Sequence, residues 1–304
     1  MYPEKDDVTI ENITIFFKKT WWFSSLILLG VNTYAREKVQ KSIDLENIHR
    51  VHFINIRGAV KLTGSEQTNL SIEGTLDDNA LGLRTSQNKE VLIIEVEMPQ
   101  HLMPVSGSKL ELKLPQSMGV RIEGVSTEWQ LDNLGATQIQ SVTGSVLLKN
   151  GQNDVDIEVV NAPIQIEGIQ GNLNLHSMNG NIQIHGVSGD IDANTIDGKI
   201  ILKQQKINQV RLSTVNGVID VSGSMSHESS LILSSVDGDL YLNLEKSDGY
   251  QCQLNALYGG KIDNQLPVSG ETTVSAGGAK LSLAVGDGQG KIEATTISGT
   301  IHIK

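Results

Sequence analysis

The sequence is poor in cysteine, aromatic residues and positive charge, and each shortage narrows the possible folds and functions. Its 304 residues include one cysteine, which excludes an internal disulfide framework and a cysteine-rich zinc site. There are 24 lysines and arginines against 35 aspartates and glutamates, so the formal net charge is −11. Because phosphate binding needs clustered basic side chains, we expect no nucleic-acid partner. The 38% of hydrophobic residues is still enough to build a core.

The few aromatic residues are concentrated at the N-terminus. Most lie before residue 36, and the rest of the chain holds only Phe53, Trp129, Tyr241, Tyr250 and Tyr258. Globular enzymes commonly fill a thick core with aromatic side chains. A chain this poor in them is expected to have a thin core of valine, isoleucine and leucine, and it lacks the stacking platforms of single-strand binders.

Residues 1–35 have the pattern of a signal peptide. Lys18 and Lys19 precede an uncharged run over residues 20–31, and Thr33 and Ala35 supply the small residues of a cleavage site. The run is short compared with the roughly 20 apolar residues of a spanning helix. We therefore expect export to the periplasm or cell surface with cleavage before Arg36. The alternatives are an uncleaved anchor, in which residues 15–31 make the only membrane contact, and a buried helix of a soluble protein.

The body of the chain is a repeat built around glycine. Around Gly180, an apolar residue lies two positions before the glycine, at Met178. Two more lie two and four positions after it, at Ile182 and Ile184. The same pattern recurs at Gly144, Gly171, Gly189, Gly198, Gly217, Gly238 and Gly299. Alternation of this kind predicts that one face of an extended strand, Met178 included, points inward.

The repeat predicts an all-β fold, a β-solenoid or β-helix. Asn, Asp or Ser often precedes the glycine, which is typical of a tight turn, so each unit of about nine residues is a short strand plus a turn. One strand cannot bury its apolar face alone, whereas stacked coils of about 18–22 residues can. A sandwich of hairpins is the alternative, but hairpins rarely keep so regular a spacing. We expect a single domain over residues 36–304, with irregular starting coils or a cap over residues 45–130 and regular repeats over residues 131–304.

The sequence also resembles a known family. The residues that carry the resemblance are Ile56-Arg57-Gly58-Ala59-Val60, the strand Leu110-Glu111-Leu112-Lys113-Leu114 ending at Pro115, and the Val-x-Gly-x-Ile/Leu units of the later part. Together they are similar to the putative-adhesin family of β-strand repeat proteins, domain of unknown function 4097, over roughly residues 45–304. The resemblance implies a β-helical bacterial protein, usually exported or membrane-associated. Its motifs are structural, so it supplies no functional residues.

Several residue groups are candidate sites. The repeats are rich in acids, namely Asp190, Asp192, Asp197, Asp220, Asp237 and Asp239, which could serve a glycosidase or bind calcium. Most of them flank a turn glycine, and turn preference explains them better. The glycine-rich stretch Gly286–Gly290 lacks the Lys-Ser/Thr of a phosphate loop. We therefore predict no catalytic, cofactor-binding or metal site, and no cofactor.

Three further features bear on partners. His176 and His185 occupy equivalent positions in successive units, so they meet only if those units share a sheet. Cys252 is expected to be a small buried residue, with intermolecular pairing as the alternative. Residues 297–304 form a complete strand unit at the chain end, which predicts an open rung. Either this rung is tolerated, with Lys304 as its gatekeeper, or it serves docking and head-to-tail self-association.

These features favour an exported, non-catalytic solenoid, adhesin-like or structural, in the bacterial cell envelope. Its partner would be an envelope protein or glycan. The alternatives are a polysaccharide-acting β-helical enzyme and a membrane-tethered scaffold that assembles with itself.

Overall fold

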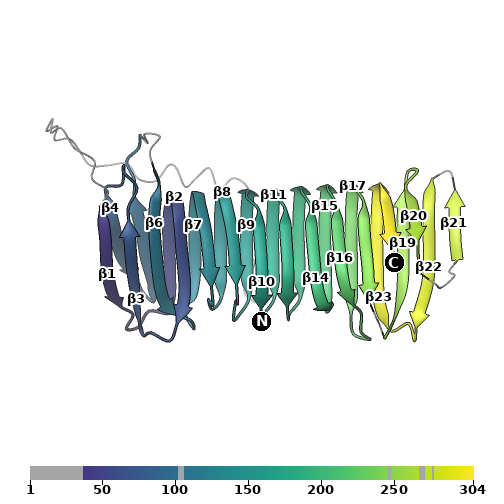
Figure 1. Ribbon diagram of the computed structural model, residues 1–304, viewed down its shortest axis with the longest axis horizontal. Helices are drawn as coiled ribbons and strands as arrows, with labels where there is room; N and C mark the ends of the chain where they lie inside the picture. Colours follow the sequence, from purple (N-terminus) through teal and green to yellow (C-terminus); the bar gives the residue numbers. More distant parts are fainter. Residues whose placement is uncertain (1–36, 102–105, 246–247, 267–270, 276) are drawn as a thin grey trace. The chain divides into compact units, whose positions relative to one another are not determined.

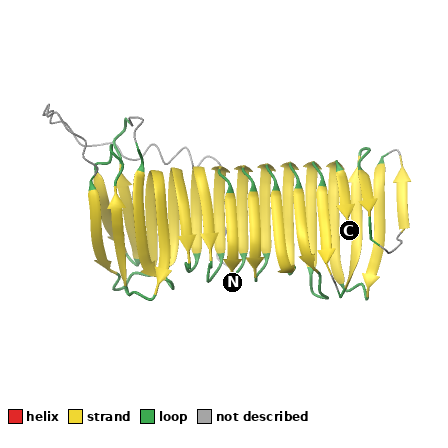
Figure 2. Ribbon diagram, viewed as in Figure 1, coloured by secondary structure: helices red, strands yellow, loops and turns green. Residues whose placement is uncertain are grey.

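The computed structural model describes residues 37–101, 106–245, 248–266, 271–275 and 277–304. From residue 36 onward the chain forms one compact unit. The described residues form strands and turns without any helix (Figure 2), so none of them belongs to a helix that could cross a membrane. The prediction of an all-β fold is confirmed. The expected signal peptide or anchor over residues 1–35 lies outside the described residues.

The strands form two facing layers, here called the first and second sheets. Three long strands start in the first sheet and end in the second, and so link all 24 strands into one ladder: β2 (Arg50–Ser65), β7 (Gly119–Asp132) and β8 (Thr137–Lys149).

The first sheet also contains β4 (Gly82–Asn88), β5 (Val91–Glu97), β9 (Val155–Asn161), β11 (Leu173–Asn179), β13 (Ile191–Asp197), β15 (Gln209–Asn216), β17 (Ser230–Asp237), β19 (Gly249–Leu257), β21 (Glu271–Ser275), β22 (Gly278–Gly286) and β23 (Gly290–Ser298). The second sheet also contains β1 (Lys38–Asp44), β3 (Asn69–Thr75), β6 (Ser108–Pro115), β10 (Ile164–Ile169), β12 (Ile182–Val187), β14 (Ile200–Lys206), β16 (Ile219–Ser224), β18 (Leu240–Glu245), β20 (Lys261–Asn264) and β24 (Thr300–Ile303).

The regular part is a parallel β-solenoid, as the repeat predicted. Strand β11 pairs in parallel with β9 and β13, and β12 pairs in parallel with β10 and β14 (Figure 1). Leu173 aligns with Ile191 in one sheet, and Ile182 aligns with Ile200 in the other. Each coil therefore contains two strand-turn units, one in each sheet. The starting coils differ, because β1 with β3, β3 with β6 and β4 with β5 pair antiparallel.

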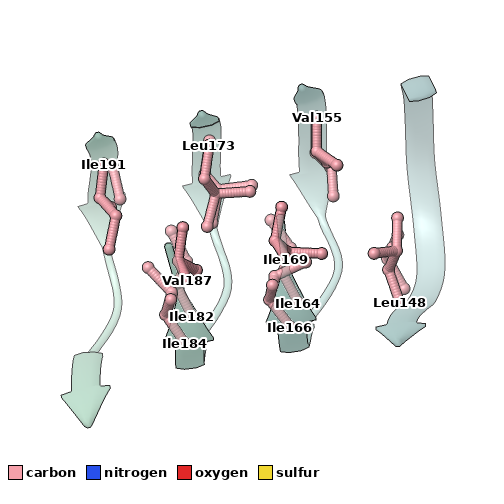
Figure 3. Close-up of a cluster of buried hydrophobic side chains, with 14 of the residues drawn as sticks. Leu148, Val155, Ile164, Ile166, Ile169, Leu173, Ile182, Ile184, Val187 and Ile191 are labelled. Carbon is pink, nitrogen blue, oxygen red and sulfur yellow. The ribbon is translucent and has the colours of Figure 1, made fainter. Parts of the chain in front are cut away.

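The core is a thin aliphatic layer between the sheets. Leu173 and Leu175 of β11 are almost completely buried, as are Ile182 and Ile184 of β12. Figure 3 shows such side chains from both sheets filling the space between the strands. Burial of one such side chain is worth about 1.5–3 kcal/mol. This layer explains the scarcity of aromatic residues after residue 36.

Glycines form a stacked column at the corner that follows β11, β13, β15, β17 and β23. The column consists of Gly180, Gly198, Gly217, Gly238 and Gly299. A Cβ added to Gly238 would lie 1.8 Å from the carbonyl oxygen of Gly217 in the preceding coil. The glycines predicted from the repeat are thus required by the close approach of neighbouring coils.

The residue two before each glycine of this column points outward, so the prediction that it faces inward is wrong. The side chains of Met178, Ile196, Val215 and Val236 are 39%, 42%, 38% and 43% exposed. The reason lies in the preceding strand, where Leu173, Leu175 and Ser177 point inward, so Met178 must point outward. At the opposite corner Val187 is buried as predicted, because Gly186 turns the chain just before it with φ of +70°.

The C-terminal strands lie inside the stack. Strand β23 pairs with β17 on one edge and β19 on the other, and β24 pairs likewise with β18 and β20. The chain runs through β19 to β22 first and then returns to fill the rung next to β17 and β18. The prediction that residues 297–304 form an open rung is therefore wrong. Self-association through them remains a prediction, but without the free backbone edge on which it was based.

Candidate binding surface

The outer face of the first sheet carries rows of polar side chains linked from coil to coil. We call its central part the polar ladder, which consists of Gln140, Asp156, Glu158, Asn174, His176, Asp192, Asn194 and Ser213. Their positions are equivalent in successive coils, because β8, β9, β11, β13 and β15 pair in parallel and in register. In-register stacking therefore turns an irregular sequence of polar residues into continuous rows.

Hydrogen bonds hold the polar ladder in place. The Gln140 amide donates to Glu158 at 3.2 Å, and the Asn174 amide donates to Asp156 at 3.2 Å. Asn194 is the centre of the ladder: its amide nitrogen lies 3.0 Å from Asp192 Oδ1, to which it donates, and 3.3 Å from His176 Nδ1, and its oxygen accepts from the Ser213 hydroxyl. These contacts fix side chains that would otherwise move freely at a surface.

Two carboxyl groups on this sheet have shifted pKa values. Burial raises the pKa of Asp156 and Glu158 adds to this, although His176 and the hydrogen bond from Asn174 act the other way. Burial also acts to raise the pKa of Glu123. Its contacts with His52 at 3.0 Å and Arg121 at 2.9 Å outweigh that effect and lower it.

The six aspartates that the sequence singled out do not converge. Asp192 lies in the polar ladder, whereas Asp220 lies on the outer face of β16 in the second sheet, 3.1 Å from Lys199 Nζ. Asp197 and Asp237 align at the corner with the glycine column. Asp190 and Asp239 lie in turns, where the Asp190 amide nitrogen donates to Asn172 at 3.0 Å and Asp239 accepts from Thr300 at 2.7 Å. Their hydrogen bonds are those of turn and ladder residues.

The other candidates are also separated. His176 lies on the first sheet and His185 on the second, so they face opposite sides of the solenoid. Gly286–Gly290 forms the turn between β22 and β23, where the Asp287 carboxylate accepts from the backbone N–H of Gln289 at 3.3 Å. Within the described ranges no three His, Cys, Asp or Glu side chains are placed to hold a metal ion. Cys252 is completely buried, as expected, and burial raises the pKa of its thiol to about 12.

The second sheet has a shallow depression lined by an aromatic pair. The rings of Tyr241 and His302 stack with centroids 4.6 Å apart, and Asp220 and Lys304 lie beside them. His302 Nδ1 lies 3.2 Å from Asp263 Oδ2, and that hydrogen bond lowers the pKa of Asp263. Sequence reasoning missed this pair, because the residues are adjacent only after β24 has entered the stack.

Comparison with known proteins gives a matching family and several similar solved structures. The family model described as Toastrack DUF4097 matches residues 42–304. A solved structure named a "putative cell adhesion protein" from Clostridium sporogenes is similar at 12% identity, covers 89% of this chain and 99% of its own, and has a TM-score of 0.25. A "putative adhesin" from Parabacteroides distasonis is similar at 13% identity over 69% of this chain and 95% of its own, with a TM-score of 0.45. No curated protein matches the sequence.

Proposed function

Because the chain belongs to the Toastrack DUF4097 family, we propose that it is an exported, non-catalytic β-solenoid that acts as an adhesin-like or structural scaffold of the bacterial cell envelope. The observation that carries the proposal is the polar ladder, whose amides, carboxylates and hydroxyls are held in register from coil to coil. A rigid periodic surface of this kind suits binding to a repetitive partner, since little side-chain entropy is lost on contact.

The chemistry of the polar ladder favours an envelope glycan as the partner. Asn174 and Asn194 supply both donors and acceptors, and Glu158 and Asp192 supply acceptors for sugar hydroxyl groups. The strands that carry them recur about every 4.8 Å, so one extended polysaccharide chain crosses several coils. Many weak contacts along such a chain add up to useful affinity.

A cell-wall binding assay tests this function. The protein is sedimented with insoluble bacterial cell walls, and the bound fraction is compared with that of the double variant Asn174→Ala/Asn194→Ala. We expect at least fivefold weaker binding for the variant, because the two amides hold the side chains of neighbouring coils in place. The matched control is Gln165→Ala/Gln183→Ala on the outer face of the second sheet. Equal binding by all three proteins would refute the polar ladder as the glycan surface.

Export is tested separately by mass spectrometry of cell fractions. A periplasmic or surface form that begins at Arg36 supports an exported scaffold. An intact N-terminus in the membrane fraction instead supports the tethered scaffold. The enzyme alternative predicts that wall polysaccharide is cleaved during the binding assay, and the separated positions of Asp192, Asp220 and Asp237 give it no support.

A further inference from the structure

One corner of the solenoid carries an unbroken outward row of aliphatic side chains. We call this row the aliphatic stripe, which consists of Ile56, Val125, Val142, Val160, Met178, Ile196, Val215, Val236 and Ile297. The parallel strand pairing places these residues side by side in neighbouring coils. For example, Ser177 aligns with Thr195 and Asn179 aligns with Asp197. Met178 and Ile196, which lie between these two pairs, are therefore neighbours. The stripe thus crosses nine neighbouring strands, from β2 to β23.

The stripe is not required by the core. The residue before most stripe positions fills the corner from inside, as Ser177, Thr195 and Ser235 do with 7%, 4% and 4% exposure. The stripe residues themselves project outward, and the most exposed of them lie in β11, β13, β15 and β17. An outward position at a turn has no structural need for an aliphatic residue, and isolated cases would call for no explanation. Nine in neighbouring strands, four of them exposed and five half-buried, form a continuous apolar row, and an apolar surface of this kind is typical of an interaction site.

Polar rows border the stripe on both sides. One border is the row of the polar ladder that contains His176 and Asn194. The other border consists of the residues that come directly after the stripe positions, such as Asn179, Asp197 and Asn216. In this border the side-chain amide of Asn216 donates to Asp197 at 2.8 Å. An apolar centre with a polar rim is the usual anatomy of a protein–protein interface. A lipid bilayer is a less suitable partner. Proteins that lie on a bilayer carry basic and aromatic residues at its surface, whereas acidic residues border the stripe.

We propose that the aliphatic stripe is the interface for a second copy of this chain. A second stripe has the same spacing of about 4.8 Å per strand, so side chains of one copy fit between those of the other along the whole row. The amide and carboxylate rim is also self-complementary, since Asn216 of one copy can donate to Asp197 or Asp237 of the other. Eight intervals of about 4.8 Å make the stripe about 38 Å long, and four residues of about 3.3 Å each make it about 13 Å wide with its rims. A pair therefore buries roughly 1,000 Å², near the lower limit for a specific interface.

Cysteine cross-linking on the full chain, solubilised in a mild detergent, tests the proposal. Ile196→Cys places a thiol on the stripe, and the native Cys252 does not interfere because it is buried. The matched control is Ile201→Cys, which replaces a partly exposed isoleucine on the outer face of β14. With a short bismaleimide we expect a covalent dimer from Ile196→Cys and at least a tenfold lower yield from Ile201→Cys.

A sedimentation measurement supplies the second readout. Ile196→Glu puts a charge into the centre of the stripe, whereas Ile201→Glu puts the same charge on the second sheet. We expect Ile196→Glu to weaken dimerisation at least tenfold and Ile201→Glu to leave it unchanged. Equal cross-linking of both cysteine variants, a monomeric wild-type chain, or cross-links to another protein alone would overturn the proposal. The Ile196 and Ile201 variants keep the polar ladder intact. Wall binding that does not depend on the polar ladder would therefore refute the glycan surface and leave the dimer measurements unaffected, so the two proposals fail separately.

Discussion

The rings of Tyr241 and His302 stack with their planes only 4° apart, although β19 to β23 separate their strands in the sequence. The contact exists because β24 enters the stack beside β18 after the chain has already built the rungs beyond it. The last strands therefore act as a rung inserted within the solenoid, and its stability depends on contacts with the coils on both sides.

Removal of core volume from the inserted rung is expected to destabilise the protein. Ile301 is completely buried between the sheets, and its backbone aligns with Leu240 on one side and Ile262 on the other. We expect Ile301→Ala to lower the free energy of unfolding by about 2–5 kcal/mol, as measured by urea denaturation followed by circular dichroism. Ile201→Ala, on the outer face of β14, is the control, and an equal loss in both variants would contradict the inserted-rung topology.

The glycine column is expected to tolerate no side chain. In Gly238→Ala the new Cβ would meet the Gly217 carbonyl oxygen at 1.8 Å, and because the contacted atom belongs to the backbone there is little room for adjustment. We expect a loss of about 1–3 kcal/mol or more in the free energy of unfolding. Gly119→Ala is the matched control, since its Cβ would come no closer than 3.6 Å to another atom. If the control loses as much stability, close approach of the coils is not the reason for the column.

Two threonines at equivalent positions are expected to respond in opposite ways to the same substitution. The buried hydroxyl of Thr195 has no hydrogen-bond partner among the described residues, whereas the hydroxyl of Thr296 donates to the Gly238 carbonyl at 2.9 Å. Thr195→Val should leave stability unchanged or raise it by about 1 kcal/mol, because it removes an unsatisfied buried group. Thr296→Val should lower stability by about 1–2 kcal/mol. Thermal and urea unfolding of the two variants would be measured side by side. A change in stability of the same sign in both variants would refute the assigned hydrogen bonding of the two hydroxyls.

The raised pKa of Asp156 predicts a pH-dependent stability. Ionisation of this carboxyl costs more in the folded than in the unfolded protein, so the cost is fully present above the raised pKa. The cost disappears as the pH falls below the ordinary value of 3.8. Asp156→Asn, which keeps the acceptor for Asn174, should therefore stabilise the protein at neutral pH and give no gain below pH 3.8.

The control for this prediction is Asp192→Asn, which removes one charge from the same row in another coil. Unfolding free energies of both variants and the wild type would be compared across the acidic range. A gain at neutral pH that is equal in the two variants would show that general charge repulsion, and not burial of Asp156, is responsible.

Sequence reasoning predicted the features that depend on local pattern. The alternation of Ile182 and Ile184 after Gly180 identified inward positions, and both side chains are buried. Equivalent glycines at a fixed spacing indicated stacked coils, and Gly180, Gly198 and Gly217 do stack. The same reasoning failed for Met178, because it counted the alternation backward through a turn. Counting forward from Leu173 through Leu175 and Ser177 would have placed Met178 outside.

The sequence alone thus determined the solenoid, its thin aliphatic core and the glycines at its corners, since these depend on side-chain periodicity and on which residues fit a tight turn. Only the tertiary structure decided that β23 and β24 enter the stack beside β17 and β18, and that the polar ladder and the aliphatic stripe become continuous surfaces. Strand order and register are fixed by backbone hydrogen bonds between distant segments, and those bonds are the same for almost every residue type. A local pattern therefore identifies a strand, but the partner of that strand is chosen by the packing of the whole chain.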